Sequence, residues 1–270
     1  AAVRSLDVQY YIRHPDLTGT LLFQALRQAA DRGVRVRLLL DDNNTQELDH
    51  TLAALDTHAN IEVRLFNPFS QRQLRWLGYL TDFGRLNRRM HNKSFTADNQ
   101  ATVMGGRNIG DEYFDAGQEV SFVDLDVLAV GAVVPQVSAD FDRYWASASA
   151  YPVATLLPKP SPEAIDRLAK EAAQVRSNPA AAPYLTALAR SDFVRRLMAS
   201  ELALEWTDVR LVSDDPAKGL GQAPAEAMLP KRLAEVLGKP ERELLLVSPY
   251  FVPTASGTEA LTGLTQSGVA

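Results

Sequence analysis

The chain has 270 residues, of which 46% are hydrophobic and 23% charged, a composition typical of a globular protein. Its net charge of −5 argues mildly against a nonspecific DNA-binding protein, which usually carries a basic face. The chain has no cysteine, which excludes disulfides and thiolate metal sites. The most apolar stretch, Phe122–Val137, is interrupted by two aspartates and a proline, so no membrane-spanning helix is predicted.

The first forty residues predict a β-α-β unit. Leu6–Ile12 alternates and is rich in Val, Tyr and Ile, as in a strand. Apolar residues then recur with helical spacing from Leu21 to Ala29, and Gly33 marks the end of the helix. Val34–Leu40 is a second, strongly apolar strand. Two strands joined by a crossover helix are expected to be parallel and buried.

Acidic residues follow the second strand, at Asp41-Asp42-Asn43-Asn44. Such residues at a strand's carboxyl end can bind Mg²⁺, but we favour a loop that caps a helix over Gln46–Leu55. Ile61–Phe66 is the next predicted strand.

The segment Asn67–Arg89 is long, basic and aromatic, and part of Gln71–Leu80 is expected to be helical. Its aromatic residues predict either a lid or membrane-contacting lip or ordinary core positions, and we favour core positions for at least two of the four. Its charges predict either an electropositive mouth for a phosphate headgroup or a solvated loop, and the sequence leaves these two alternatives open. The aromatic residues are Phe69, Trp76, Tyr79 and Phe83, and the basic residues here and nearby are Arg64, Arg72, Arg75, Arg85, Arg88, Arg89 and Lys93.

The pattern H-x-K-x4-D, formed by His91, Lys93 and Asp98, lies in a predicted hairpin that turns at Asp98-Asn99. Alternation along a strand places His91 and Lys93 on the same face. A neutral imidazole can attack phosphorus, and a neighbouring ammonium can bind the phosphate oxygens that gain charge in the transition state. The pattern therefore predicts a site for phosphoryl transfer.

Two further residues complete this candidate site. Asn108 follows Gly105-Gly106, where the backbone can approach a ligand closely, and its amide can donate to the same oxygens. Glu119 comes 28 residues after His91, because 119 − 91 = 28. A carboxylate that accepts the Nδ1 proton of His91 would fix the tautomer and leave Nε2 free to attack.

The remaining chain predicts one more strand of the first domain, then a connector, helices and an added strand. Lys218 lies in the loop that follows and can contact phosphate, although a lone loop lysine is usually solvated. The strands are expected over Glu119–Val130 and Trp206–Val212, the helices over Val137–Ala146, Glu163–Val175 and Tyr184–Glu201, and the proline-rich connector over Tyr151–Pro162.

A second copy of the first unit is predicted near the end of the chain. Glu243–Val252 is expected to be a buried strand, Thr258–Leu264 a helix, and Gly268-Val269 echoes Gly33-Val34. The predicted domains are therefore residues 1–150, a connector with helical insert over 151–240, and the start of a second domain over 241–270. The chain begins with Ala1 and stops within this pattern, which predicts a piece of a longer protein, and no second H-x-K-x4-D motif occurs in it.

The motif and its flanks resemble the phospholipase D superfamily, in particular bacterial proteins of the cardiolipin synthase type. The resemblance extends over SLDVQYYI, LLLDDNN, RLFNPF and LDVLAVG. It implies an α/β fold with a mixed, largely parallel sheet flanked by helices, in two similar halves that share one site. It also implies that His91 is a covalent nucleophile, that Lys93 and Asn108 bind phosphate, that Glu119 pairs with His91, and that Asp98 is more structural than catalytic. No metal or other cofactor is implied.

The implied reaction transfers a phosphatidyl group between alcohols through a phosphohistidine, as in cardiolipin synthesis from phosphatidylglycerol, or hydrolyses a phospholipid. The second catalytic His would come from the missing half of a longer chain or from a dimer mate, so this piece alone is expected to be inactive. The expected partner is a phospholipid at a membrane surface, with the protein peripheral in the bacterial cell envelope. The alternative is a phosphodiesterase of the same superfamily that acts on nucleic acid.

Overall fold

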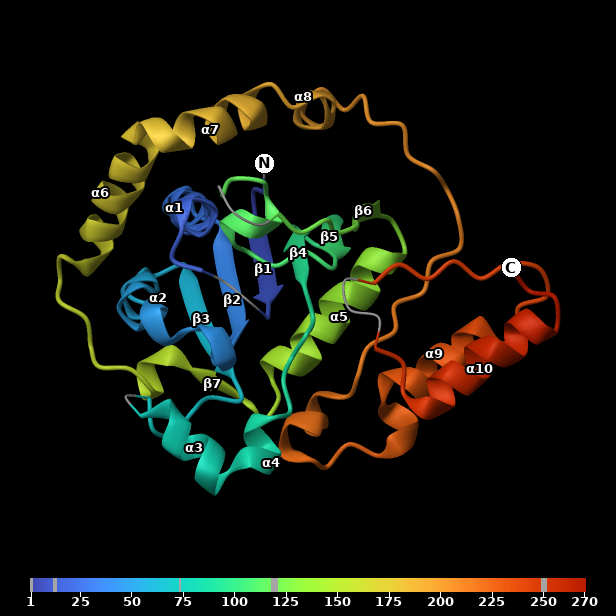
Figure 1. Ribbon diagram of the computed structural model, residues 1–270. Helices are drawn as coiled ribbons and strands as arrows, with labels where there is room; N and C mark the ends of the chain where they lie inside the picture. The colour runs from blue at the N-terminus through green and yellow to red at the C-terminus, as the bar shows by residue number, and fades with distance from the viewer. Residues whose placement is uncertain (1, 12–13, 73, 118–120, 249–251) are drawn as a thin grey trace.

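The computed structural model describes residues 2–11, 14–72, 74–117, 121–248 and 252–270. At its centre lies a seven-stranded mixed sheet in the order β6-β5-β4-β1-β2-β3-β7 (Figure 1). The predicted α/β class with a mixed, helix-flanked sheet is confirmed. The strands are β1 (Ser5–Tyr10), β2 (Arg35–Asp41), β3 (Ile61–Phe66), β4 (Ser94–Ala97), β5 (Ala101–Gly105), β6 (Asp126–Val130) and β7 (Ala150–Pro152).

Parallel pairing is confined to the centre of the sheet. β1 and β2 are parallel, as the predicted β-α-β unit requires, and β2 and β3 are parallel as well. The pairs β1–β4, β4–β5, β5–β6 and β3–β7 are antiparallel. The sheet is therefore less parallel than expected, because a hairpin and two returning edge strands extend the parallel centre on both sides.

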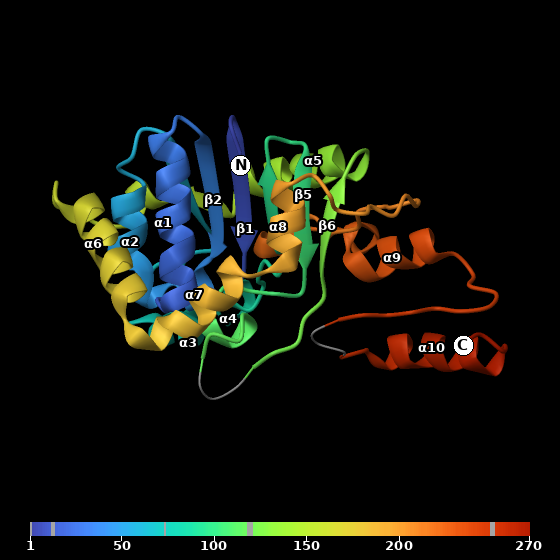
Figure 2. The ribbon, with the colours of Figure 1, turned by 90° about the horizontal axis from the view of Figure 1, so that it is seen from above.

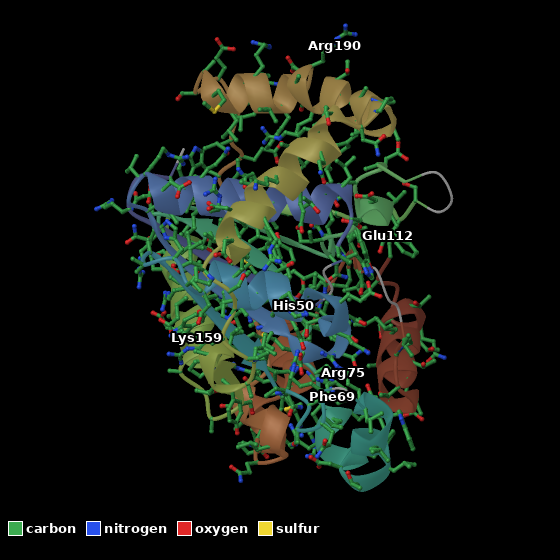
Figure 3. The ribbon with its side chains drawn as sticks, turned by 90° about the vertical axis from the view of Figure 1, so that its left-hand side faces the viewer. His50, Phe69, Arg75, Glu112, Lys159 and Arg190 are labelled. Carbon is green, nitrogen blue, oxygen red and sulfur yellow. The ribbon has the colours of Figure 1, made fainter. Side chains whose placement is uncertain are left out.

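Helices cover both faces of the sheet. α1 (Leu17–Asp31), α2 (Asp49–Leu55) and α6 (Ala164–Ser177) lie on one face, where α6 packs across the other two, and α5 (Val133–Trp145) lies on the opposite face (Figures 1 and 2). Figure 3 views the molecule from the side of α6. Leu38 belongs to the core under α1 and α2, and the next residue, Leu39, packs with Phe141 of α5. Burial on both faces explains the unbroken apolar run of β2.

The remaining helices lie at the periphery. They are α3 (Arg75–Thr81), α4 (Phe83–Leu86), α7 (Ala182–Ala189), α8 (Asp192–Met198), α9 (Leu229–Leu237) and α10 (Ala255–Gln266). In the part of the chain that the structure describes, no helix combines the length and apolar character that crossing a membrane requires. The predicted helix over Tyr184–Glu201 is divided into α7 and α8, because Ser191 caps a new helix with its side chain.

Three predicted strands differ from the structure. Residues 121–125 form no strand before β6, and Val123 is almost fully exposed at this edge of the sheet. Trp206–Val212 is irregular and runs beside α5, where the Leu211 amide donates to the Gln136 side chain at 3.3 Å. Residues 243–248 are exposed and irregular as well, because no sheet face covers them. The sheet also extends past the predicted end of the first domain, because β7 includes the first residues of the predicted connector.

The end of the chain nevertheless repeats the backbone hydrogen bonds of the first unit. After α1, the Val34 amide donates to Ala29, and the Arg35 amide donates to Arg4. After α10, the Val269 amide donates to Leu264, and the Ala270 amide donates to Arg242 in the same way. The two connecting glycines, Gly33 and Gly268, have φ values of 90° and 85°. The local geometry of the predicted repeat is therefore present, although its strand is not.

Candidate active site

A tight hairpin presents the predicted motif at one end of the sheet. β4 and β5 pair in antiparallel register from Ser94–Met104 to Ala97–Ala101, and Asp98 and Asn99 turn the chain with φ of 55° and 54°. Left-handed backbone at both central residues, with the Gln100 amide bonded to the Ala97 carbonyl, makes a type I′ turn, in which Asp and Asn are favoured. His91 and Lys93 precede β4 instead of lying within it, so the predicted strand begins later than expected.

Asp98 holds the hairpin turn against the start of β1. Its carboxylate accepts hydrogen bonds from the backbone amides of Val3, Arg4 and Ser5, with N···O distances of 2.7–3.2 Å. Three charge-assisted bonds to consecutive amides fix the position of both segments. The structure therefore gives Asp98 a structural role at the opposite end of β4 from His91.

His91 and Lys93 line one cavity of about 490 Å³, together with Gly105, Gly106 and Asp124. The Lys93 ammonium donates to the His91 backbone carbonyl at 2.8 Å. The His91 ring lies 4.1 Å, between centroids, from the ring of Tyr11. The motif thus places an imidazole and an ammonium at one opening, although neither residue lies within a strand, and Tyr11 contacts the imidazole from the end of β1.

The electrostatic environment keeps the imidazole neutral. Desolvation, followed by the positive charges of Lys93 and Lys218, lowers the pKa of His91 to about 4, although Asp214 acts in the opposite direction. Desolvation also lowers the pKa of Lys93, against the charges of Asp124 and Asp126. A histidine with a pKa of about 4 is unprotonated at neutral pH, as a nucleophile must be.

Asn108 and Glu119 were the other two predicted members of the site. Asn108 is fully buried, its amide donates to the Tyr113 hydroxyl at 3.2 Å, and it is not among the residues that line the cavity of His91 and Lys93. Glu119 lies outside the described residues. Gly105 has no room for a side chain, because an added Cβ would lie 2.0 Å from the Asp126 carboxylate. The phosphate-binding role of Asn108 and the pairing of Glu119 with His91 remain predictions.

Comparison with known proteins identifies the family of the chain. The family described as "Cardiolipin synthase, PLD-like domain" matches residues 1–145. The chain belongs to this cardiolipin synthase, PLD-like domain family. It is 52% identical to cardiolipin synthase C of Escherichia coli, over 99% of the chain and 56% of that protein. It is 34% identical to an uncharacterized protein of Helicobacter pylori, over 93% of the chain and 50% of that protein.

The chain thus spans about half the length of these curated relatives. Among solved structures, it resembles NucT from Helicobacter pylori with a TM-score of 0.38 and 16% identity, over 52% of this chain and 78% of that one. This likeness is too weak to carry further argument.

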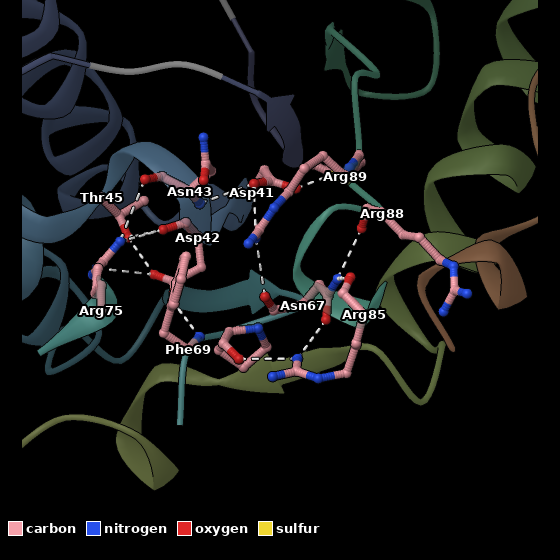
Figure 4. Close-up of polar contacts among 12 residues, drawn as sticks. Asp41, Asp42, Asn43, Thr45, Asn67, Phe69, Arg75, Arg85, Arg88 and Arg89 are labelled. Atoms are coloured by element: carbon pink, nitrogen blue, oxygen red, sulfur yellow. Dashed lines mark hydrogen bonds and ion pairs between the residues drawn. The ribbon is translucent and has the colours of Figure 1, made fainter. Parts of the chain in front are cut away.

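In this member of the family, a buried ionic network supports the residue before His91. The Asp41 carboxylate, at the end of β2, accepts the Met90 amide at 2.8 Å and pairs with Arg89 at 3.3 Å. Asp42 pairs with Arg75 (Figure 4) and with Arg72. Burial raises the pKa of Asp41 to about 7, and Arg89 opposes this shift. These contacts extend the predicted loop into a structural support for the motif.

Ion pairs also reduce the positive charge that the basic segment exposes. Five of the six arginines from Arg64 to Arg89 pair with carboxylates, so most of its charge is neutralised within the fold. Arg88 is the exception among the described residues, since no hydrogen bond or ion pair to its guanidinium is formed there. The predicted electropositive mouth is therefore reduced to Arg88 and the lysines beside His91.

The prediction that at least two of the four aromatic residues are core is wrong. Only Phe69 is buried, under the Arg75 guanidinium, whose carbon lies 5.0 Å from the ring centroid (Figure 3). Trp76 and Phe83 are each 60% exposed, and Tyr79 is 37% exposed. Helices this short cannot bury two faces, so α3 and α4 present their aromatic side chains outward.

Proposed function

We propose that the chain is the first half of a phospholipase D-type phosphatidyltransferase that makes cardiolipin from phosphatidylglycerol. The observation that carries this proposal is the neutral His91 beside Lys93 at one open cavity. The relative named cardiolipin synthase C, 52% identical over nearly the whole chain, supports the lipid substrate. The neutralised arginines of Arg64–Arg89 give little support to the nucleic-acid alternative.

The proposed reaction has two steps. Nε2 of His91 attacks the phosphorus of one phosphatidylglycerol, and glycerol leaves with a proton from a general acid. The hydroxyl of a second phosphatidylglycerol then attacks the phosphohistidine, and the same group accepts its proton. Lys93 stabilises the charged oxygens in both steps, with Asn108 as its proposed partner.

The proposed general acid and base is the His of a second H-x-K-x4-D motif. It would come from the rest of a longer protein or from a dimer mate. The backbone hydrogen bonds after α10, which repeat those after α1, support the first source. They also support the proposed domain division, in which a second similar domain begins near residue 241. On this proposal, the 270-residue chain alone has half a site and no appreciable activity.

We also propose that the protein binds peripherally to the bacterial membrane. Trp76, Leu80 and Phe83 are 60–73% exposed on α3 and α4. Aromatic and apolar side chains of this kind insert into the interface between lipid headgroups and acyl chains.

The test uses the natural full-length protein with phosphatidylglycerol in mixed micelles and, separately, with DNA. We expect cardiolipin and glycerol by mass spectrometry, and a loss on the order of 10⁴-fold in His91→Ala. His50→Ala, which changes an exposed histidine in α2 (Figure 3), serves as the control. Phosphatidic acid alone would make the enzyme a phospholipase, and cleaved DNA with intact lipid would make it a nuclease.

The pH dependence tests the nucleophile separately. Because only the neutral imidazole attacks, and its pKa lies at about 4, kcat/KM should be insensitive to this group down to about pH 5 and fall near pH 4. An acidic limb near the ordinary histidine value of about 6.5 that shifts with substitutions at Lys93 would contradict the proposed environment of His91.

A further inference from the structure

A loop more than 120 residues after His91 in the sequence lies against the active site. Its first residue, Ser213, donates to Asp140 of α5 at 2.6 Å, and the Tyr144 hydroxyl donates to the Asp214 carbonyl at 3.1 Å. Gly219 packs so closely that an added Cβ would lie 2.5 Å from the Ser149 hydroxyl. Contacts at both ends therefore fix this loop, residues 213–221, on the first domain.

The loop directs one cation toward His91. The Lys218 side chain is only 14% exposed and pairs with Asp214. Asp214 is itself held, because its other carboxylate oxygen accepts the Leu229 amide at 2.6 Å. Lys218 lines two cavities, of about 460 and 650 Å³, and His91 and Asp214 line both of them. A lysine held in this way is preorganised, unlike the solvated loop lysine that the sequence suggested.

Arg88 lies against the end of the same loop. Its guanidinium lies against Gly221, where an added Cβ would be 2.5 Å from Nη1. It also lines the 650 Å³ cavity with Tyr11 and His91. The charged residues that line this cavity are Lys218, Arg88, Arg89 and Asp214. Because Arg89 is paired with the buried Asp41, the other three leave one net positive charge. Lys93 is absent from its walls and lies in the neighbouring cavities.

We propose that Lys218 and Arg88 form a second anion subsite, which binds the headgroup phosphate of the acceptor lipid. This inference rests on the proposed function, because a transfer between two phospholipids brings two phosphates to one histidine. Lys93 binds the phosphate under attack. The second subsite holds the acceptor, so that its terminal hydroxyl lies near the phosphohistidine.

The step that the subsite assists is the second one. The acceptor hydroxyl oxygen forms a bond to phosphorus, and the bond from phosphorus to Nε2 of His91 breaks with its electron pair returning to the imidazole. The hydroxyl proton passes to the general base of the proposed second motif. Water can attack the phosphohistidine without an anion subsite. A subsite that holds the acceptor lipid therefore favours transfer over hydrolysis.

The test compares a charged acceptor with neutral ones in the natural full-length protein. Lys218→Met and Arg88→Gln should each lower cardiolipin formation by about 10-fold, the effect of losing one charge-assisted hydrogen bond. Formation of phosphatidic acid from water, and of phosphatidylethanol from added ethanol, should stay within about 2-fold. Lys239→Met and Arg190→Gln, at exposed positions, are the matched controls.

Equal losses with all acceptors would overturn the subsite, because Lys218 would then serve the donor phosphate or the fold. No loss with any acceptor would overturn it as well. A wild-type protein without lipid activity would instead refute the proposed function, and a binding measurement then decides about the subsite. By calorimetry, glycerol phosphate should bind more tightly than inorganic phosphate and be weakened about 10-fold in Lys218→Met. Preference for inorganic phosphate would contradict a lipid headgroup as the ligand.

Discussion

The first β-α-β unit and the last unit, the repeat predicted at the end of the chain, share a backbone pattern but differ in burial. In the first unit, Leu38 and Leu39 of β2 are 1% and 0% exposed. In the last unit, Leu245 and Val247 are 78% and 71% exposed, although the Ala270 amide makes the same kind of bond as the Arg35 amide.

The difference separates two contributions to strand formation. Local sequence fixes the left-handed glycine and the hydrogen bonds at the end of the helix. A regular strand forms only where neighbouring strands bind its edges and helices cover its faces. β1 has β2 on one side and β4 on the other, and residues 243–248 have no such neighbours in the described structure.

The largest expected loss of stability comes from replacing Asp41, the last residue of β2. Asp41→Ala would leave Arg89 buried without its carboxylate partner, and breaking a buried ion pair in this way costs about 3–5 kcal/mol. Asp31→Ala, in the same unit, removes a carboxylate that is 43% exposed and should cost less than about 1 kcal/mol. Urea unfolding followed by circular dichroism measures both, and equal costs would show that the Asp41 network does not support the fold.

A second prediction compares matched leucines in the two units. Leu38→Ala removes a fully buried side chain and should lower the free energy of unfolding by about 2–5 kcal/mol. Leu245→Ala removes an exposed one and should change it by no more than about 0.5 kcal/mol. The same urea titration measures both variants. A large cost for Leu245→Ala would mean that the last unit is buried against another surface in solution, such as a second copy of the chain.

The contrast between local patterns and distant contacts also explains what the sequence could predict. The first unit, β3 and the hairpin follow from patterns a few residues long, and the structure confirms them. A pattern of the same kind singled out His91 and Lys93, whose roles stay predictions. The features that the sequence left open depend on distant contacts: Asp41 binds the Met90 amide 49 residues away, and Lys218 lines a cavity shared with His91. The exposed Trp76 and Phe83 were missed because their spacing suits either a core or a surface.

The smallest expected effect on stability comes from the left-handed glycine that follows the helix in both units. Gly33 and Gly268 both adopt left-handed backbone, and nothing within 4 Å would contact an added Cβ at either position. Alanine at these positions therefore introduces backbone strain of about 1–2 kcal/mol without a steric clash. In the first unit this strain acts on the whole domain, so Gly33→Ala should lower the free energy of unfolding by that amount.

In the last unit the same strain should act only locally. Gly268→Ala should leave global unfolding unchanged and speed hydrogen exchange at the Val269 and Ala270 amides, which bond to Leu264 and Arg242. Gly263→Ala, within α10 and also without a close neighbour, is the control for an added methyl group. If Gly268→Ala lowered global stability as much as Gly33→Ala, the last unit would unfold together with the first domain. Its greater exposure would then not mean a smaller contribution to the free energy of unfolding.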